Sequence, residues 1–229
     1  MIDPLWLTST QPRELLGLLR GTSNVARTTI GRRKLRLFGV ACCRRLPHLF
    51  TRDRLQAALA VAEQFANRTL TKADADTAAN RVWWGSWLWK REERRVAVAA
   101  RATLSNHIWT AALAGEWLLS PLLNDLRGTT IAAERTTQAD LIRCLFGNGA
   151  RRLSIPAEWR SSTVVALAVG IQAEGAFDRL PILADALEES SCDDVAMLSH
   201  ARGPGPHAPG CWVVDLVLGS KSVYPQTRR

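Results

Sequence analysis

The stretch RRKLRLFGVACCRRL, residues 32–46, decides the fold class because it has the pattern of an amphipathic helix. Its apolar side chains recur at helical spacing, at Leu35, Phe38, Cys42 and Leu46. Basic side chains flank this stripe on the remaining face of the predicted helix. Pro47 follows directly, and a proline at that point ends a helix or bends it.

Segments of the same kind continue along the chain on both sides of this helix. Further predicted helices begin near Pro12, Thr51, Thr71, Gln138, Ser162, Asp178 and Asp193. Because no long period-two alternation interrupts them, the sequence predicts an all-α protein. We expect a multi-helix body over residues 1–146 and a C-terminal helical module over residues 147–229, separated by the irregular segment GNGARRLSIPAEW. One continuous domain is the alternative.

Six tryptophans between residues 83 and 117 mark the middle of the chain. They follow the helix predicted from Thr71, which we expect to break near Gly85. Tryptophans three to five residues apart most often pack in the core between long helices, and we adopt that interpretation here. A surface on which ligands stack is the alternative.

The positive charge is concentrated in the first quarter of the chain. The 229 residues carry a formal net charge of +9, and residues 1–54 account for +8 of it. Such a patch can contact phosphates or an acidic protein. The candidate nucleic-acid contacts are Arg32, Arg33, Lys34, Arg36, Arg44 and Arg45. The simpler interpretation is that arginines cover the solvent-exposed faces of helices.

Cysteine usage and hydropathy indicate a reducing compartment. No charged segment followed by an apolar run opens the sequence, and no apolar stretch reaches the ~20 residues that a membrane helix needs. The five cysteines are an odd number in a chain of this length, which is typical of free thiols. We therefore expect a cytoplasmic protein with no membrane partner and with Cys42 and Cys43 packed as small apolar residues.

The segment SHARGPGPHAPGCWVVDLVLG, residues 199–219, offers the most specific candidate site. Two thiols and two imidazoles near it suit zinc, at Cys192, His200, His207 and Cys211. Their spacing matches no compact zinc finger because a closely spaced cysteine pair is missing. A phosphate-binding loop is disfavoured because Pro204, Pro206 and Pro209 have no N–H to donate. We prefer a stiff structural connector that directs Trp212 into the core, with zinc binding as the alternative.

Three stretches together resemble a known family: RKLRLFGVACCRR at 33–45, FDRLPILADALEESSC at 177–192 and HARGPGPHAPGCWVVDLVLG at 200–219. They are similar to an uncharacterised family of helical proteins that is expanded in planctomycete-type bacteria. The resemblance implies a helical fold and no particular activity. This chain departs from the family pattern after Phe146, and it has Ala208 and Pro209 where a basic residue is typical.

Sequence motifs favour no enzyme class. The chain contains no nucleophile-elbow, zinc-protease or Walker-type motif. We therefore expect a non-enzymatic interaction or scaffold protein with a protein partner. Nucleic-acid binding through the basic helices is the first alternative. A zinc-binding module or metal-dependent enzyme at the C-terminal Cys/His cluster is the second.

Overall fold

The computed structural model describes residues 3–22, 24–115, 130–147 and 155–219, and these residues form helices and connecting segments without any strand. The predicted all-α class is therefore confirmed. The α-helices are α1 (Pro4–Thr8), α2 (Pro12–Thr22), α3 (Thr29–Arg44), α4 (Asp53–Ala66), α5 (Lys72–Trp83), α6 (Arg91–Thr103), α7 (Ile108–Ala112), α9 (Ile131–Phe146), α10 (Ser162–Glu174), α11 (Leu180–Glu189), α12 (Val195–Arg202) and α13 (Trp212–Val217).

The chain divides into two compact units, and the division differs from the expected boundary near residue 147. One unit comprises residues 26–138, and the other comprises residues 1–25 together with 139–229. The N-terminal 25 residues thus belong with the C-terminal module, because hydrogen bonds connect α1 to the end of α9.

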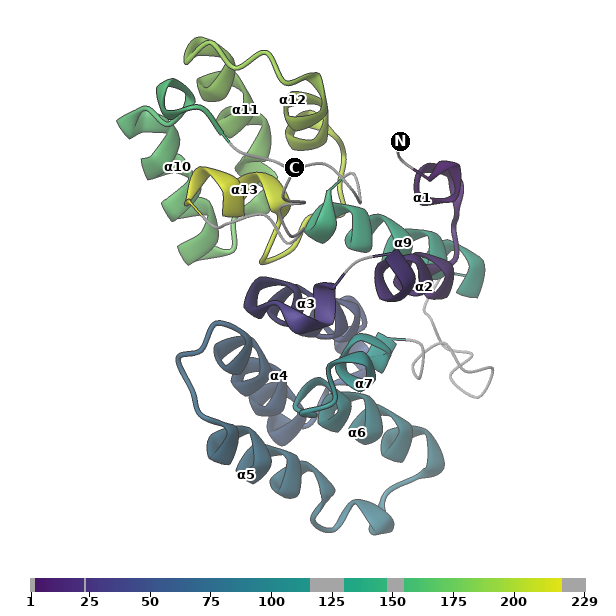
Figure 1. Ribbon diagram of the computed structural model, residues 1–229. Helices are drawn as coiled ribbons and strands as arrows, with labels where there is room; N and C mark the ends of the chain where they lie inside the picture. Colours follow the sequence, from purple (N-terminus) through teal and green to yellow (C-terminus); the bar gives the residue numbers. More distant parts are fainter. Residues whose placement is uncertain (1–2, 23, 116–129, 148–154, 220–229) are drawn as a thin grey trace. The chain divides into compact units, whose positions relative to one another are not determined.

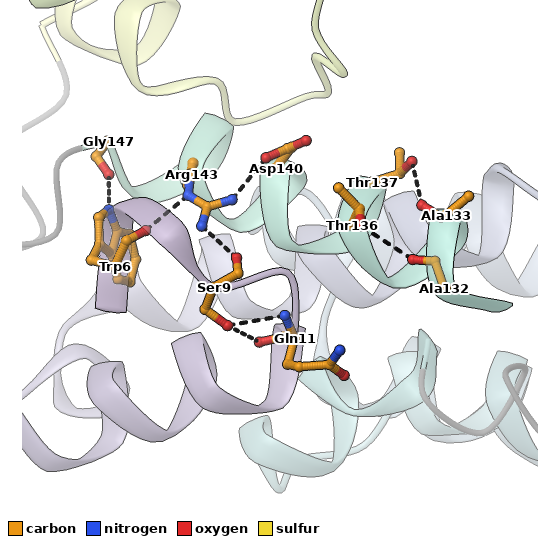
Figure 2. Close-up of polar contacts among 10 residues, drawn as sticks. All are labelled: Trp6, Ser9, Gln11, Ala132, Ala133, Thr136, Thr137, Asp140, Arg143 and Gly147. Carbon is orange, nitrogen blue, oxygen red and sulfur yellow. Dashed lines mark hydrogen bonds and ion pairs between the residues drawn. The ribbon is translucent and has the colours of Figure 1, made fainter. Parts of the chain in front are cut away.

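Arginine 143, near the end of α9, holds α1 in place (Figure 2). Its Nε donates to the carbonyl of Trp6 at 2.8 Å and its Nη2 to the carbonyl of Ser9 at 2.6 Å. The indole N–H of Trp6 donates in turn to the carbonyl of Gly147 at 2.9 Å. Trp6 is also buried, so these hydrogen bonds hold a buried N-terminal side chain next to the end of α9 within the same unit.

The unit of residues 26–138 is built around α3, which corresponds to the amphipathic helix predicted over residues 32–46. Thr28 caps it by accepting from the N–H of Gly31, and its buried face packs against α4, α6 and α7. At the crossing with α7 the backbones come close, since a Cβ on Gly39 would lie 2.0 Å from the carbonyl oxygen of Ala111. Only glycine fits at that position.

The other unit places four C-terminal helices, α10 to α13, around an apolar core (Figure 1). Asp194 caps α12 by accepting from the N–H groups of Ala196 and Met197, so this cap lies one residue after the expected Asp193. The connector after α12 then leads into α13, whose residues from Trp212 to Val217 are all buried. The predicted burial of Trp212 is confirmed.

The tryptophans between α5 and α6 correct the expectation of a core cluster. The helix breaks where expected, at Gly85, which has a left-handed φ of 74°. Because the rings lie at this turn and not along a helix face, Trp83, Trp84 and Trp87 are 49%, 76% and 58% exposed. Trp89 alone of these four is buried. Trp117 lies outside the described residues.

Candidate metal centre

Four metal-ligating side chains converge in the unit that contains the C-terminal module. They are Cys144, His200, His207 and Cys211, and one ligand atom from each lies within 4.8 Å of the others. Both cysteines are buried, and both histidines are partly buried. The residue types and their convergence are those of a Cys₂His₂ zinc site.

Three separate segments bring these ligands together. Cys144 lies near the C-terminal end of α9, and His200 lies in the last turn of α12. His207 belongs to the connector, and Cys211 is the residue that precedes the first turn of α13. The connector turns back on itself with left-handed φ angles at Gly205 and Gly210, which is what glycine permits without strain.

Distances within the cluster are close to those that zinc requires. The Sγ of Cys211 lies 3.4 Å from Nε2 of His200, and the Sγ of Cys144 lies 3.7 Å from Nδ1 of His207. In a tetrahedron with Zn–S of about 2.3 Å and Zn–N of about 2.0 Å, neighbouring ligand atoms are about 3.3–3.8 Å apart. The most widely separated ligand atoms, which are up to 4.8 Å apart, would therefore have to move about 1 Å closer to bind one zinc ion.

The connector also supplies an outer contact that orients one ligand. Nε2 of His207 lies 3.2 Å from the carbonyl oxygen of Gly203, and only a protonated nitrogen can donate to that oxygen. This tautomer leaves the lone pair of Nδ1 directed to the Cys144 side of the cluster. A backbone carbonyl that fixes the second nitrogen of a histidine is a usual feature of metal sites.

Charge within the cluster favours a thiolate at Cys211. Burial raises the pKa of this thiol, but hydrogen bonds with Cys144, His200 and His207 outweigh burial and hold the pKa well below its ordinary value. For His207, burial lowers the pKa, whereas the hydrogen bond and charge of Cys211 raise it, and the net direction is upward. The cluster thus already stabilises the charge state in which a cysteine binds a metal.

The same four groups suit catalysis less well than metal binding. A nucleophilic cysteine next to a histidine must be reached by its substrate. Cys144 and Cys211 are only 1% and 0% exposed, and they belong to the apolar core of their unit. The arrangement therefore encloses an ion better than it presents a nucleophile.

Sequence reasoning found three of these four residues and missed Cys144. It paired the histidines with Cys192 because that cysteine lies nearer to them in the sequence. The structure places the Sγ of Cys192 4.0 Å from Sδ of Met197, outside the four-residue group. The sequence gives only an indirect indication of Cys144. Cys42 and Cys43 are adjacent and predicted to pack in a helix, Cys192 and Cys211 lie near the histidines, and Cys144 is the cysteine that remains.

The candidate nucleic-acid contacts do not form a single exposed basic face. Lys34 and Arg36 are buried. The guanidinium of Arg36 donates to the carbonyls of Thr103 and Ser105, and it lies 4.4 Å from the ring centroid of Phe65. Burial and the nearby charge of Arg32 lower the pKa of Arg36 to about 10. Two of the six predicted contacts thus belong to the interior.

The other four basic residues of α3 and its C-terminus have partners within their own unit. Arg45 forms an ion pair with the buried Glu134 at 2.9 Å, and Arg44 donates to Glu63 at 2.8 Å. Arg33 donates to the side chain of Asn67 at 2.8 Å, and Arg32 lies 3.4 Å from the carbonyl of Asn106. These contacts connect α3 to neighbouring segments. All four side chains therefore have hydrogen-bond or ion-pair partners within the protein and need no phosphate to supply one.

Comparison with protein-family models, with curated proteins and with solved structures found no match for this chain. No helix among the described residues is both long and apolar enough to cross a bilayer.

Proposed function

We propose that the unit formed by residues 1–25 and 139–229 is a zinc-binding module, and that its ion has a structural role in a non-enzymatic interaction protein. The observation that carries this proposal is the convergence of the ligand atoms of Cys144, His200, His207 and Cys211 within 4.8 Å. Two thiolates and two imidazoles are a usual set for a structural zinc ion.

The number of ligands supports a structural role over a catalytic one. Catalytic zinc sites keep one coordination position for water or substrate, whereas structural sites are filled by four protein ligands. Here four protein ligands are available, and the two sulfur atoms are buried. A zinc ion would tie α9, α12 and the start of α13 together, which would fix the surface of the module for a partner.

The state of the cysteines supports a reducing, cytoplasmic location for this protein. None of the five forms a disulfide, and four of them are 1% exposed or less: Cys42, Cys43, Cys144 and Cys211. Zinc-bound thiolates are themselves stable in a reducing compartment.

Metal analysis tests the proposal directly. The full chain, produced with zinc in the medium and purified under reducing conditions, should contain one equivalent of zinc by elemental analysis. A strong chelator should lower the melting temperature, and added zinc should restore it. Protein that takes up no zinc, with a melting curve that a chelator leaves unchanged, would contradict the proposal.

Cobalt(II) substitution gives a second readout that does not depend on stability. Cobalt(II) bound tetrahedrally by thiolates absorbs visible light, so the spectrum reports the ligand set. The Cys192→Ser variant should keep this absorption, and the Cys144→Ser variant should lose or shift it. The reverse result would assign the site to the residues closest in sequence instead.

A further inference from the structure

A compact group of exposed apolar side chains lies at the turn between α5 and α6. We call it the tryptophan corner, and it consists of Trp83, Trp84, Trp87 and Leu88, which are 49%, 76%, 58% and 81% exposed. Elsewhere in the described part of the chain, large exposed apolar side chains are scattered. Single exposed apolar residues are ordinary, whereas a contiguous group marks an interaction surface.

The turn holds these rings outward by specific contacts. Ser86 donates its hydroxyl to the carbonyl of Trp83 at 2.8 Å, and Arg54 donates to the carbonyl of Trp84 at 2.7 Å. The rings of Trp84 and Trp87 pack edge to face, with centroids 5.9 Å apart. The turn lies at the end of the α5–α6 pair, where it projects beyond both helices (Figure 1). The corner is therefore an ordered apolar tip.

The chain segment that carries this tip is rich in basic side chains. Residues 81–95 contain five basic and two acidic side chains, a net charge of +3. Arg81, Lys90, Arg91 and Arg94 are exposed. Of the two acidic residues, Glu93 forms an ion pair with Arg52 at 2.9 Å. The guanidinium of Arg101 lies 5.4 Å from the ring centroid of Trp83, which adds positive charge at the base of the corner.

We propose that the tryptophan corner binds the surface of an anionic phospholipid bilayer. Indole rings are amphipathic and concentrate at the interface between lipid and water. Leu88, the most exposed of the four side chains, would enter the acyl region, and the flanking lysine and arginines would contact lipid phosphates. The expectation of no membrane partner was based on the absence of spanning segments, and this peripheral mode needs none.

Single-stranded nucleic acid is the main competing partner, because aromatic rings and arginines also bind bases and phosphates. The structure favours lipid over nucleic acid for two reasons. Leu88 offers no planar face for a base to stack on, although it is the most exposed member of the group. The rings of Trp84 and Trp87 also meet edge to face at 77°, so they do not form a parallel platform for successive bases.

Cosedimentation with lipid vesicles tests this proposal on the full chain. Vesicles of phosphatidylcholine with one-third phosphatidylglycerol should bind the protein at low salt, and pure phosphatidylcholine vesicles should bind it at least tenfold more weakly. The double variant Trp84→Ser/Leu88→Ser should lower binding to the anionic vesicles roughly tenfold or more, since each substitution removes an apolar side chain that would contact the lipid. The variant Lys90→Glu/Arg91→Glu should abolish the preference for anionic vesicles.

Matched control variants distinguish binding through the tryptophan corner from non-specific hydrophobic adsorption. Ile182→Ser and Val195→Ser remove exposed apolar side chains of the other unit, which are 53% and 75% exposed, and they should leave vesicle binding unchanged. Circular dichroism should show the same helix content for all variants. Brominated acyl chains should quench tryptophan emission in the parent protein and not in Trp84→Ser/Leu88→Ser.

Several outcomes would overturn the proposal. The first is a failure to bind either kind of vesicle at low salt. The second is equal binding by the parent protein and the Trp84→Ser/Leu88→Ser variant. The third is binding to a single-stranded oligonucleotide that is tighter than binding to vesicles and is lost in the same variant, because this would assign the corner to nucleic acid.

Discussion

The Sγ atom of Cys211 lies 3.4 Å from Nε2 of His200, although Cys211 precedes α13 and His200 lies in the last turn of α12. The connector between the two helices reverses the chain to bring these atoms together. Next to them lies Trp212, whose ring centroid is 5.4 Å from that of His200. The candidate metal site and the burial of α13 therefore depend on the same reversal of the chain.

Substitution of the cluster cysteines should separate metal binding from simple packing. Without a metal, Cys144→Ser and Cys211→Ser should each cost about 1–3 kcal/mol for a buried hydroxyl, and Trp212→Ala should cost about 3–5 kcal/mol. With zinc bound, the two cysteine variants should cost at least as much as Trp212→Ala. Urea unfolding with and without chelator measures the order, and Cys192→Ser is the control that should stay chelator-sensitive.

The ion pair between Arg45 and Glu134 should contribute more to stability than the pair between Arg44 and Glu63. Glu134 is almost fully buried, so Arg45→Ala leaves a buried carboxylate without its cation. We expect a loss of roughly 2–3 kcal/mol, less than for a fully buried pair because the arginine remains partly exposed. Arg44→Ala should cost about 0.5 kcal/mol in urea unfolding, and equal losses would contradict this ranking.

Glycine 39 should tolerate no side chain. A Cβ there would meet the carbonyl oxygen of Ala111 at 2.0 Å, so α3 and α7 must separate. Gly39→Ala should lower the free energy of unfolding by about 1–3 kcal/mol or more. Gly17→Ala, in α2, is the matched control because nothing lies within 4 Å of its added Cβ. That change should be neutral or stabilising by up to ~1 kcal/mol, and a similar loss in both variants would be evidence against the close packing.

The start of α5 predicts a pH effect that can be measured at one residue. The hydroxyl and the backbone N–H of Thr71 both donate to the carboxylate of Asp74, and these bonds lower its pKa below the ordinary value. A lowered folded-state pKa stabilises the fold above the unfolded pKa, near 3.9, and this contribution is lost as the pH falls through the folded value. In an NMR titration, Thr71→Val should raise the pKa of Asp74, and an unchanged value would argue against this cap.

Local patterns in the sequence predicted most helices and left their assembly open. The apolar stripe of α3, the break at Gly85 and the capping residue Thr71 all follow from spacing and turn chemistry within a few residues. The contact of Arg143 with the carbonyl of Trp6 joins residues 137 positions apart, and no local pattern encodes such a pairing. For this reason the sequence did not reveal that the N-terminus belongs with the C-terminal module.

Two differences between the sequence-based predictions and the structure have the same origin. Cys192 was preferred to Cys144 as a zinc ligand because it lies closer to the histidines in the sequence, and closeness in sequence does not determine closeness in space. The tryptophans near Gly85 were assigned to the core from their spacing, although that spacing keeps residues on one face only while the helix continues. Lys34 and Arg36 illustrate the converse, since residue type predicted exposure and long-range contacts placed both in the interior.

The separation of Cys144 from His207, which is 63 residues along the chain, gives the proposed metal a topological effect as well as a chemical one. An ion held by both residues would act as a cross-link that closes a long loop. Unlike a disulfide, an ion that binds only the folded chain leaves the unfolded chain unrestricted, so its contribution would rise with zinc concentration and affinity. The closure of this loop would therefore depend on the zinc supply of the cell.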